Sequence, residues 1–167
     1  MLLKQAYDQA HEKNYTLAVD FEGSTIPVTR QIDETLKLAH QHHATNEAVL
    51  EGHEQDLFWQ TVRELTRGTV TCKVSILVSQ QAAFLQEIER VSHEQGLTVT
   101  VVAHAGNGIM YIELPADQQM THILNAISTL RQCAYEMKGF LVVERCPTEI
   151  KQRLNVWGET GASFHLM

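Results

Sequence analysis

The clearest alternation of apolar and polar residues lies in the second half of the chain. Residues 70–78 and 97–104 alternate with a period of two, and residues 109–114 follow after a four-residue Ala-Gly-Asn-Gly link. Such alternation predicts half-buried strands, and the short link predicts that the last two strands form a hairpin. Residues 139–144 are almost continuously apolar and predict a fourth strand that is buried on both sides.

Two stretches with apolar residues at helical spacing separate these strands. The first follows Ser79, a favourable N-cap, and ends at Gly96, while the second begins at Pro115. The order strand, helix, strand, strand, helix, strand over residues 70–145 predicts an α+β fold with a ferredoxin-like split βαβ unit and an antiparallel sheet. Both helices then cover one face of this sheet, and the other face is free to meet a ligand or a partner.

The first half of the chain carries a weaker version of the same pattern. Alternation over residues 15–22 predicts a strand, residues 29–43 a helix, residues 47–50 a short strand, and residues 52–67 a second helix. This order predicts a partial second ferredoxin-like unit, although no sequence repeat links the two halves. We expect residues 1–167 to form a single domain.

The composition and charge of the chain argue against several classes of binding partner. The chain has 44% hydrophobic residues, a net charge of −7 and no cluster of lysine or arginine, which argues against nucleic acid and anionic membranes as partners. No apolar run is long enough to predict a transmembrane segment. Cys72, Cys133 and Cys146 are odd in number and lack Cys-x-x-Cys spacing, so we expect reduced thiols in a cytoplasmic protein, two of them buried.

The alternation also assigns side chains to the uncovered sheet face. If the hairpin closes with four link residues, His104 lies opposite Ile109 and Val102 lies opposite Tyr111. The polar residues predicted on that face are Lys73, Ser75, Thr100, His104, Tyr111 and Glu113. The face of Glu144 is ambiguous because its strand is apolar on both sides. Since the face is only half polar, it is either a solvated surface or one that binds a ligand or partner.

Each candidate also has an ordinary structural role. His104 can hydrogen-bond the turn at the end of its strand, and Asn107 with Gly108 suits a tight turn. Lys73 can be a solvated strand lysine. Glu144 and Arg145 can form a surface pair, since neighbouring strand residues are expected to point to opposite faces.

Several motifs, taken in order, resemble one known family. Residues 103–108, Ala-His-Ala-Gly-Asn-Gly, are similar to the His-x-Gly-Asp-Gly-Asn motif in the C-terminal domain of FAD-linked oxidases, a group that includes glycolate oxidase and D-lactate dehydrogenases. Residues 19–24, 57–64, 139–147 and 155–158 resemble the glycolate oxidase branch in particular. The resemblance implies a duplicated ferredoxin-like fold whose open sheet face covers a flavin and forms the substrate pocket.

The resemblance also implies that the cofactor and the substrate are bound mainly by different domains. FAD would be bound by a separate N-terminal domain that is absent from this chain, so the isolated chain is expected to bind no FAD and to be inactive. The parent protein would be an FAD-dependent oxidoreductase for a small 2-hydroxy acid, of glycolate or D-lactate type, assembled with other subunits. The catalytic residue implied is His104, and the residues implied to face substrate or flavin are Lys73, Asn107, Tyr111, Glu144 and Arg145.

No metal is expected in this chain. Active members of the family hold a divalent metal with two histidines and a glutamate, of which only His104 and Glu144 have counterparts here. Tyr111 replaces the second histidine, and Arg145 replaces a histidine that follows the glutamate, so the site is incomplete. The alternative to an oxidoreductase domain is a stand-alone ferredoxin-like module that binds a small ligand or dimerises without catalysis.

Overall fold

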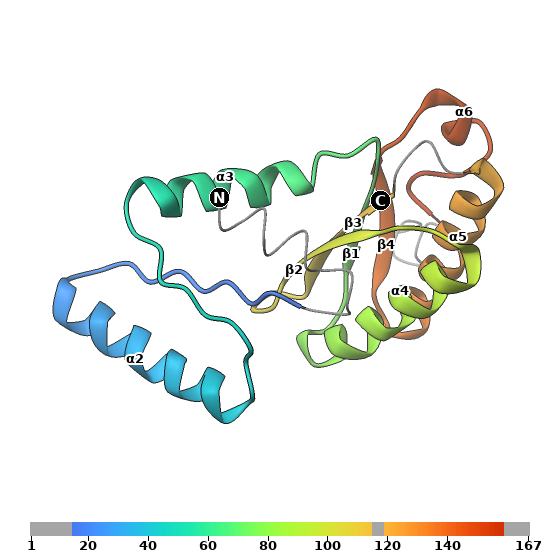
Figure 1. Ribbon diagram of the computed structural model, residues 1–167. Helices are drawn as coiled ribbons and strands as arrows, with labels where there is room; N and C mark the ends of the chain where they lie inside the picture. The colour runs from blue at the N-terminus through green and yellow to red at the C-terminus, as the bar shows by residue number, and fades with distance from the viewer. Residues whose placement is uncertain (1–14, 115–118, 159–167) are drawn as a thin grey trace, which may run out of the picture. The chain divides into compact units, whose positions relative to one another are not determined.

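The computed structural model of the chain describes residues 15–114 and 119–158 (Figure 1). The chain divides between Phe58 and Trp59 into two compact units, and each unit is described by itself. Pro115, the predicted first residue of the last long helix, lies outside the described residues. No helix in the described ranges is both long and apolar enough to cross a lipid bilayer.

The second unit is built on a four-stranded antiparallel sheet with the strand order β2–β3–β1–β4. Its strands are β1 (Val70–Ser75), β2 (Thr100–His104), β3 (Ile109–Leu114) and β4 (Phe140–Arg145). Its helices are η1 (Val78–Gln80, a 3₁₀ turn), α4 (Gln81–Gln95), α5 (Met120–Glu136) and α6 (Thr148–Lys151). This connectivity and strand order confirm the α+β class and the ferredoxin-like unit predicted for residues 70–145.

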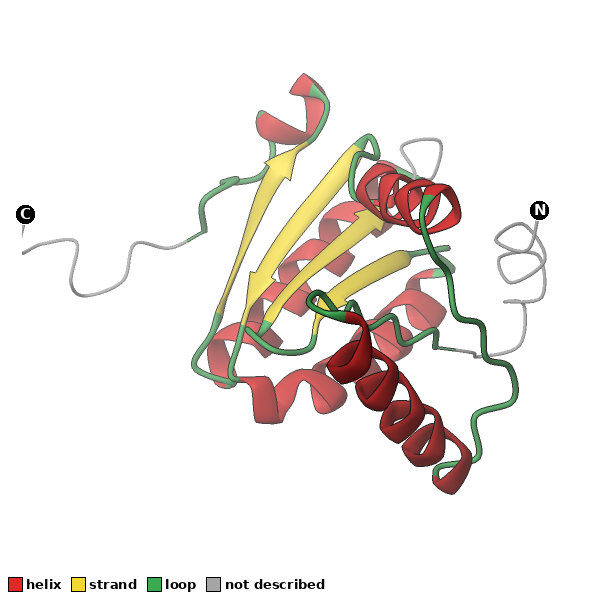
Figure 2. Ribbon diagram, turned by 90° about the vertical axis from the view of Figure 1, so that its left-hand side faces the viewer, coloured by secondary structure: helices red, strands yellow, loops and turns green. Residues whose placement is uncertain are grey.

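Helices α4 and α5 pack together on one face of the sheet (Figure 2). The sheet side chains that face them are the alternating apolar residues, among which Val70, Val74, Met110 and Ile112 are completely buried. From the helices, Phe84, Ile88, Ile123 and Ile127 fill the same core. The intervening sheet residues therefore point away from α4 and α5, and we call the surface they form the open face.

Helix α4 ends as predicted but begins later. Ser79 is not its N-cap, because residues 78–80 form the η1 turn and the helix starts at Gln81. At the other end Gly96 has φ 63°, and the N–H of Leu97 donates to the carbonyl of Ser92 at 2.8 Å. This arrangement is a glycine C-cap of the Schellman type.

The first unit contradicts part of the sequence prediction. In residues 15–58 the structure contains α2 (Thr25–Gln41) and the start of α3 (His53–Leu65), but no strand. The strands predicted at residues 15–22 and 47–50, and with them the partial second ferredoxin-like unit, are wrong. Alternation can mark an extended amphipathic segment, but a strand also needs a backbone partner, and Leu17 with 78% exposure has no covering layer.

The cysteines agree with the expected free thiols. Cys72 and Cys146 are buried, Cys133 is partly exposed, and none forms a disulfide. Burial raises the pKa of Cys72 to about 12, although the positive charge of Arg131 counteracts part of the rise. The Cys72 thiol is therefore protonated and unreactive at neutral pH, which suits a core residue.

Candidate functional site

Three rows of side chains cross the open face from strand to strand. The row at the hairpin end consists of His104, Ile109, Ser75 and Phe140; the middle row of Val102, Tyr111, Lys73 and Val142; and the last row of Thr100, Glu113, Thr71 and Arg145. Directly opposite residues share a face of the sheet. The predicted pairs His104–Ile109 and Val102–Tyr111 are therefore confirmed.

Tyr111 lies at the centre of a group of polar side chains on the open face. Its ring meets the His104 ring edge to face, with 6.0 Å between centroids and 74° between planes. The Nζ atom of Lys73 lies 5.8 Å from the Tyr111 ring centroid and 3.6 Å from Oε1 of Glu144. His104, Tyr111, Lys73 and Glu144, each from a different strand, thus form one chain of contacts, which we call the central cluster.

The contacts within the central cluster are individually weak. Lys73 and Glu144 are partly exposed, with side-chain exposures of 31% and 41%. Such a pair contributes at most about 1 kcal/mol, and a cation near an exposed aromatic ring contributes a similar amount. The cluster therefore places the ammonium, phenol and imidazole groups near one another and leaves each able to bind a ligand.

The hairpin turn uses the side chain of Asn107 for its own structure. Its Oδ1 accepts from the N–H of Ile109 at 3.0 Å, and the N–H groups of Asn107 and Gly108 donate to the carbonyl of His104 at 3.2 and 3.3 Å. Asn107 is therefore a turn residue that closes the hairpin. The structure does not bring it into the central cluster.

A β-bulge decides which way Glu144 and Arg145 point. The register between β1 and β4 shifts so that Cys72 pairs with Val143 and Thr71 pairs with Arg145, which leaves Glu144 as the extra residue. Glu144 reaches Lys73 on the open face, and Arg145 lies opposite Thr71 on that same face. The expectation that these neighbours point to opposite faces is wrong because the bulge breaks the alternation.

Arg145 lies at the opposite corner of the open face from His104. Arg145 is on the edge strand β4 and His104 on the edge strand β2, three strand spacings or about 14 Å apart across the sheet. The two residues also belong to the two outer rows, which are about 13 Å apart along the strands. The Nη1 atom of Arg145 donates to the carbonyl of Arg67 at 3.0 Å. A small ligand cannot contact both residues, so Arg145 is outside the central cluster.

The described side chains of the central cluster do not form a set of metal ligands. Over residues 15–114 and 119–158, no three His, Cys, Asp or Glu side chains are placed to hold a metal ion. His104 and Glu144 come from opposite edges of the sheet, and the Lys73 ammonium lies beside the Glu144 carboxylate. The positive charge available to a ligand in this cluster is therefore that of an ammonium group.

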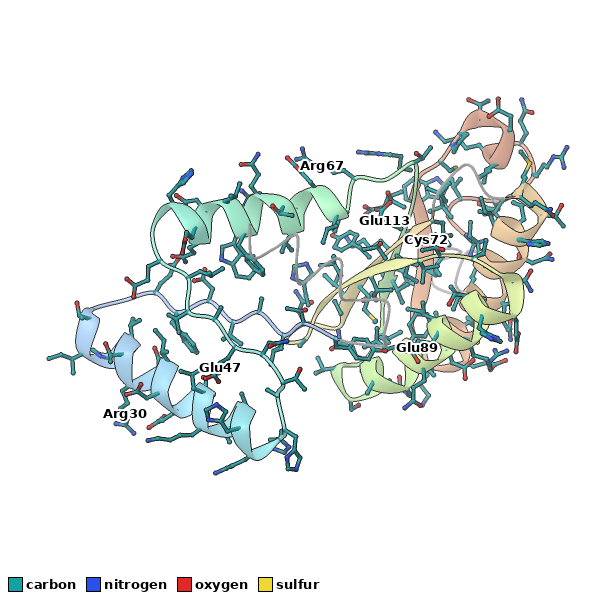
Figure 3. All side chains as sticks on the ribbon, viewed as in Figure 1. Arg30, Glu47, Arg67, Cys72, Glu89 and Glu113 are labelled. Carbon is teal, nitrogen blue, oxygen red and sulfur yellow. The ribbon has the colours of Figure 1, made fainter. Side chains whose placement is uncertain are left out.

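Glu113 is a buried carboxyl whose role the sequence does not reveal. It is 7% exposed, and neither carboxylate oxygen has a hydrogen-bond partner among the described residues. The Glu113 side chain is labelled in Figure 3. It packs against Gly68, where an added Cβ would collide with its Oε2. Burial raises the pKa of Glu113, and the positive charge of Arg145 counteracts part of the rise.

Gln81 is a buried polar residue that the sequence pattern did not single out. It is the first residue of α4, is 7% exposed, and donates from Nε2 to the carbonyl of His104 at 3.1 Å. A glutamine at the start of a helix is usually solvated, and no pattern in the sequence connects it to a strand end more than twenty residues away. Only the packing of α4 against the hairpin reveals this contact.

The architecture is that of a ferredoxin-like domain with a polar cluster on its open face, and the model of the family described as FAD linked oxidases, C-terminal domain, matches residues 2–144. The chain belongs to this family and is thus part of an FAD-linked oxidoreductase. The match includes the whole central cluster and ends before Arg145. Curated proteins and solved structures give no significant match.

The family implies FAD, and the described residues fit contact with a flavin better than retention of one. The turn from β1 into α4, residues 76–80, contains no glycine and cannot bring its backbone against a pyrophosphate as a Gly-rich loop does. On the open face, Phe140 is 56% exposed and Ile109 is partly exposed beside the polar cluster. Such a surface suits contact with a planar ring system.

Proposed function

We propose that the open face forms the substrate side of the flavin site in an FAD-dependent oxidoreductase for a small 2-hydroxy acid, of glycolate or D-lactate type. The central cluster is the observation that carries this proposal, because it joins an imidazole, a phenol and an ammonium on the face that α4 and α5 leave uncovered. FAD would be bound by a separate domain, where it supplies the hydride acceptor. Other subunits of an oxidase complex would complete the assembly.

The members of the cluster have distinct roles in this proposal. Oxidation of a 2-hydroxy acid to the keto acid removes a hydride from the α-carbon and a proton from the hydroxyl group, and the exposed imidazole of His104 accepts that proton. The Lys73 ammonium binds the carboxylate, and Glu144 holds the ammonium in place when no acid is bound. Tyr111 lies on β3, between the strands of His104 and Lys73, and donates a hydrogen bond to the bound acid.

Replacing Lys73 by methionine should weaken the binding of glycolate and of D-lactate by about tenfold or more, because a charge-assisted hydrogen bond to the carboxylate is lost. The measurement is an NMR titration of the full chain with each acid, in which signals of His104, Tyr111 and Lys73 should shift together. Lys151→Met, on α6, is the matched control and should bind like the wild type. Unchanged affinity in Lys73→Met, or no shift at the cluster in the wild type, contradicts the proposal.

The assignment of FAD to a separate domain predicts that this chain alone does not retain flavin. The chain expressed alone should purify without flavin, because the turn from β1 into α4, residues 76–80, has no glycine that would let the backbone approach a pyrophosphate. The visible absorbance of the purified protein measures this directly. A yellow preparation with one flavin per chain would show that this chain holds the cofactor itself and would refute the assignment of FAD to a separate domain.

A further inference from the structure

We infer that Gln81 is the positioning residue that fixes His104 on the open face. The catalytic importance of this role rests on the proposed function, in which His104 accepts a proton. Whether Gln81 fixes the position of His104 can be tested separately. Gln81 reaches no ligand site itself. It acts through the backbone of His104, to which its side-chain amide donates at 3.1 Å.

Burial makes the Gln81 contact a specific one. The residue is 7% exposed, so its amide has little access to water and needs a protein partner. That partner is the carbonyl of His104. Since Phe84 and Ile88 anchor α4 in the core, the contact of Gln81 links the end of β2 to a helix that is packed into the buried core.

The end of β2 has few other interactions that hold it in place, so the hydrogen bond from Gln81 matters there. β2 is an edge strand of five residues that pairs only with β3 in the described sheet, and His104 is its last residue. The backbone bonds that end there, from the N–H groups of Asn107 and Gly108, are long at 3.2 and 3.3 Å. Short edge strands fray readily at their ends, because few hydrogen bonds and contacts hold them.

The orientation of the His104 ring depends on this strand end. Its edge-to-face contact with Tyr111, at 6.0 Å between centroids, is a direct consequence of the register between β2 and β3. A displacement of the backbone by about 1 Å is enough to cost a reacting group much of its effect. Gln81 thus contributes to the site by keeping the imidazole beside the phenol.

The test compares Gln81→Met with Gln86→Met. Methionine has nearly the length of glutamine but no donor, and Gln86 is an exposed residue of the same helix, which makes it the matched control. In Gln81→Met we expect loss of the nuclear Overhauser contact between the His104 and Tyr111 rings, and about three- to tenfold weaker glycolate binding, as the loss of one neutral hydrogen bond allows. Gln86→Met should leave both unchanged.

A third variant separates positioning from a general loss of stability. In Gln81→Glu an ionised carboxylate faces the His104 carbonyl and repels it, whereas the protonated carboxyl group can donate to it. In Gln81→Glu, the contact between the His104 and Tyr111 rings should therefore return as the pH is lowered. At each pH it is compared with the same contact in the wild type. Gln81→Met should show no recovery at any pH, and recovery there would contradict the inference.

The possible failures are distinguishable. If Gln81→Met keeps the ring contact and binds glycolate like the wild type, the positioning role is overturned and the proposed function stands. If wild-type protein binds neither acid, the proposed function fails. In that case the contact between the His104 and Tyr111 rings still decides whether Gln81 fixes His104.

Discussion

Replacing Gly108 by alanine should lower the free energy of unfolding by about 2–4 kcal/mol. Gly108 has φ 76°, a conformation that residues with a side chain rarely adopt, and an added Cβ would collide with the carbonyl oxygen of Ile76. The backbone cannot easily move away, because Gly108 accepts a hydrogen bond from the N–H of Ile76 at 3.0 Å. Urea denaturation followed by circular dichroism measures the change.

Gly106 provides the matched control in the same turn. No atom lies within 4 Å of a Cβ added there, and its φ is not in the left-handed range. Gly106→Ala should therefore change the stability by less than about 0.5 kcal/mol. Equal stability of the two variants would show that the turn relaxes freely. Because the N–H of Gly108 also donates to the carbonyl of His104, Gly108→Ala should disturb the His104 signals as well.

Replacing Glu113 by glutamine should stabilise the protein at high pH by about 1–2 kcal/mol, because a buried ionised carboxylate without a hydrogen-bond partner costs more than a buried neutral amide. Burial raises the pKa of Glu113 in the folded state above its unfolded value, so folding favours the protonated form. The stability linked to this group is then complete below the unfolded pKa and is lost as the pH rises through the folded pKa. Glutamine stays neutral and avoids that loss.

The pH dependence of the difference is the decisive measurement. Denaturation of Glu113→Gln and wild type over a pH series should give nearly equal stabilities in acid and a difference that grows as the pH rises. Glu144→Gln serves as the control, since Glu144 is an exposed carboxylate whose pairing with Lys73 contributes less than about 1 kcal/mol. A difference that does not change with pH would mean that Glu113 does not titrate as its burial implies.

The hairpin that carries His104 could be predicted because two independent constraints agree. Alternation places His104 and Tyr111 on one face, and a four-residue link sets His104 opposite Ile109, which is the observed register. The helix stripes were equally informative, since Phe84, Ile88 and Val91 are all buried. Where a pattern recurs over several turns or pairs, tertiary packing has little freedom to override it.

Features that depend on long-range partners could not be predicted. Alternation over residues 15–22 suggested a strand but could not supply the second strand that a ladder needs. The bulge beside Thr71 arises from one extra residue in β4, and no composition signal marks it. Gln81 and Glu113 look like ordinary polar residues until packing buries them.

Because of the bulge in β4, deletion of a single residue there would change the net charge of the open face. Glu144 has no partner in the β1–β4 register, so removing it alone would leave Arg145 opposite Thr71 and the ladder complete. The fold would survive such a deletion, but the Lys73 ammonium would lose the carboxylate that lies 3.6 Å from it. A gap of one residue at this point in a related sequence would therefore mark a domain with the same architecture and a more positive binding surface.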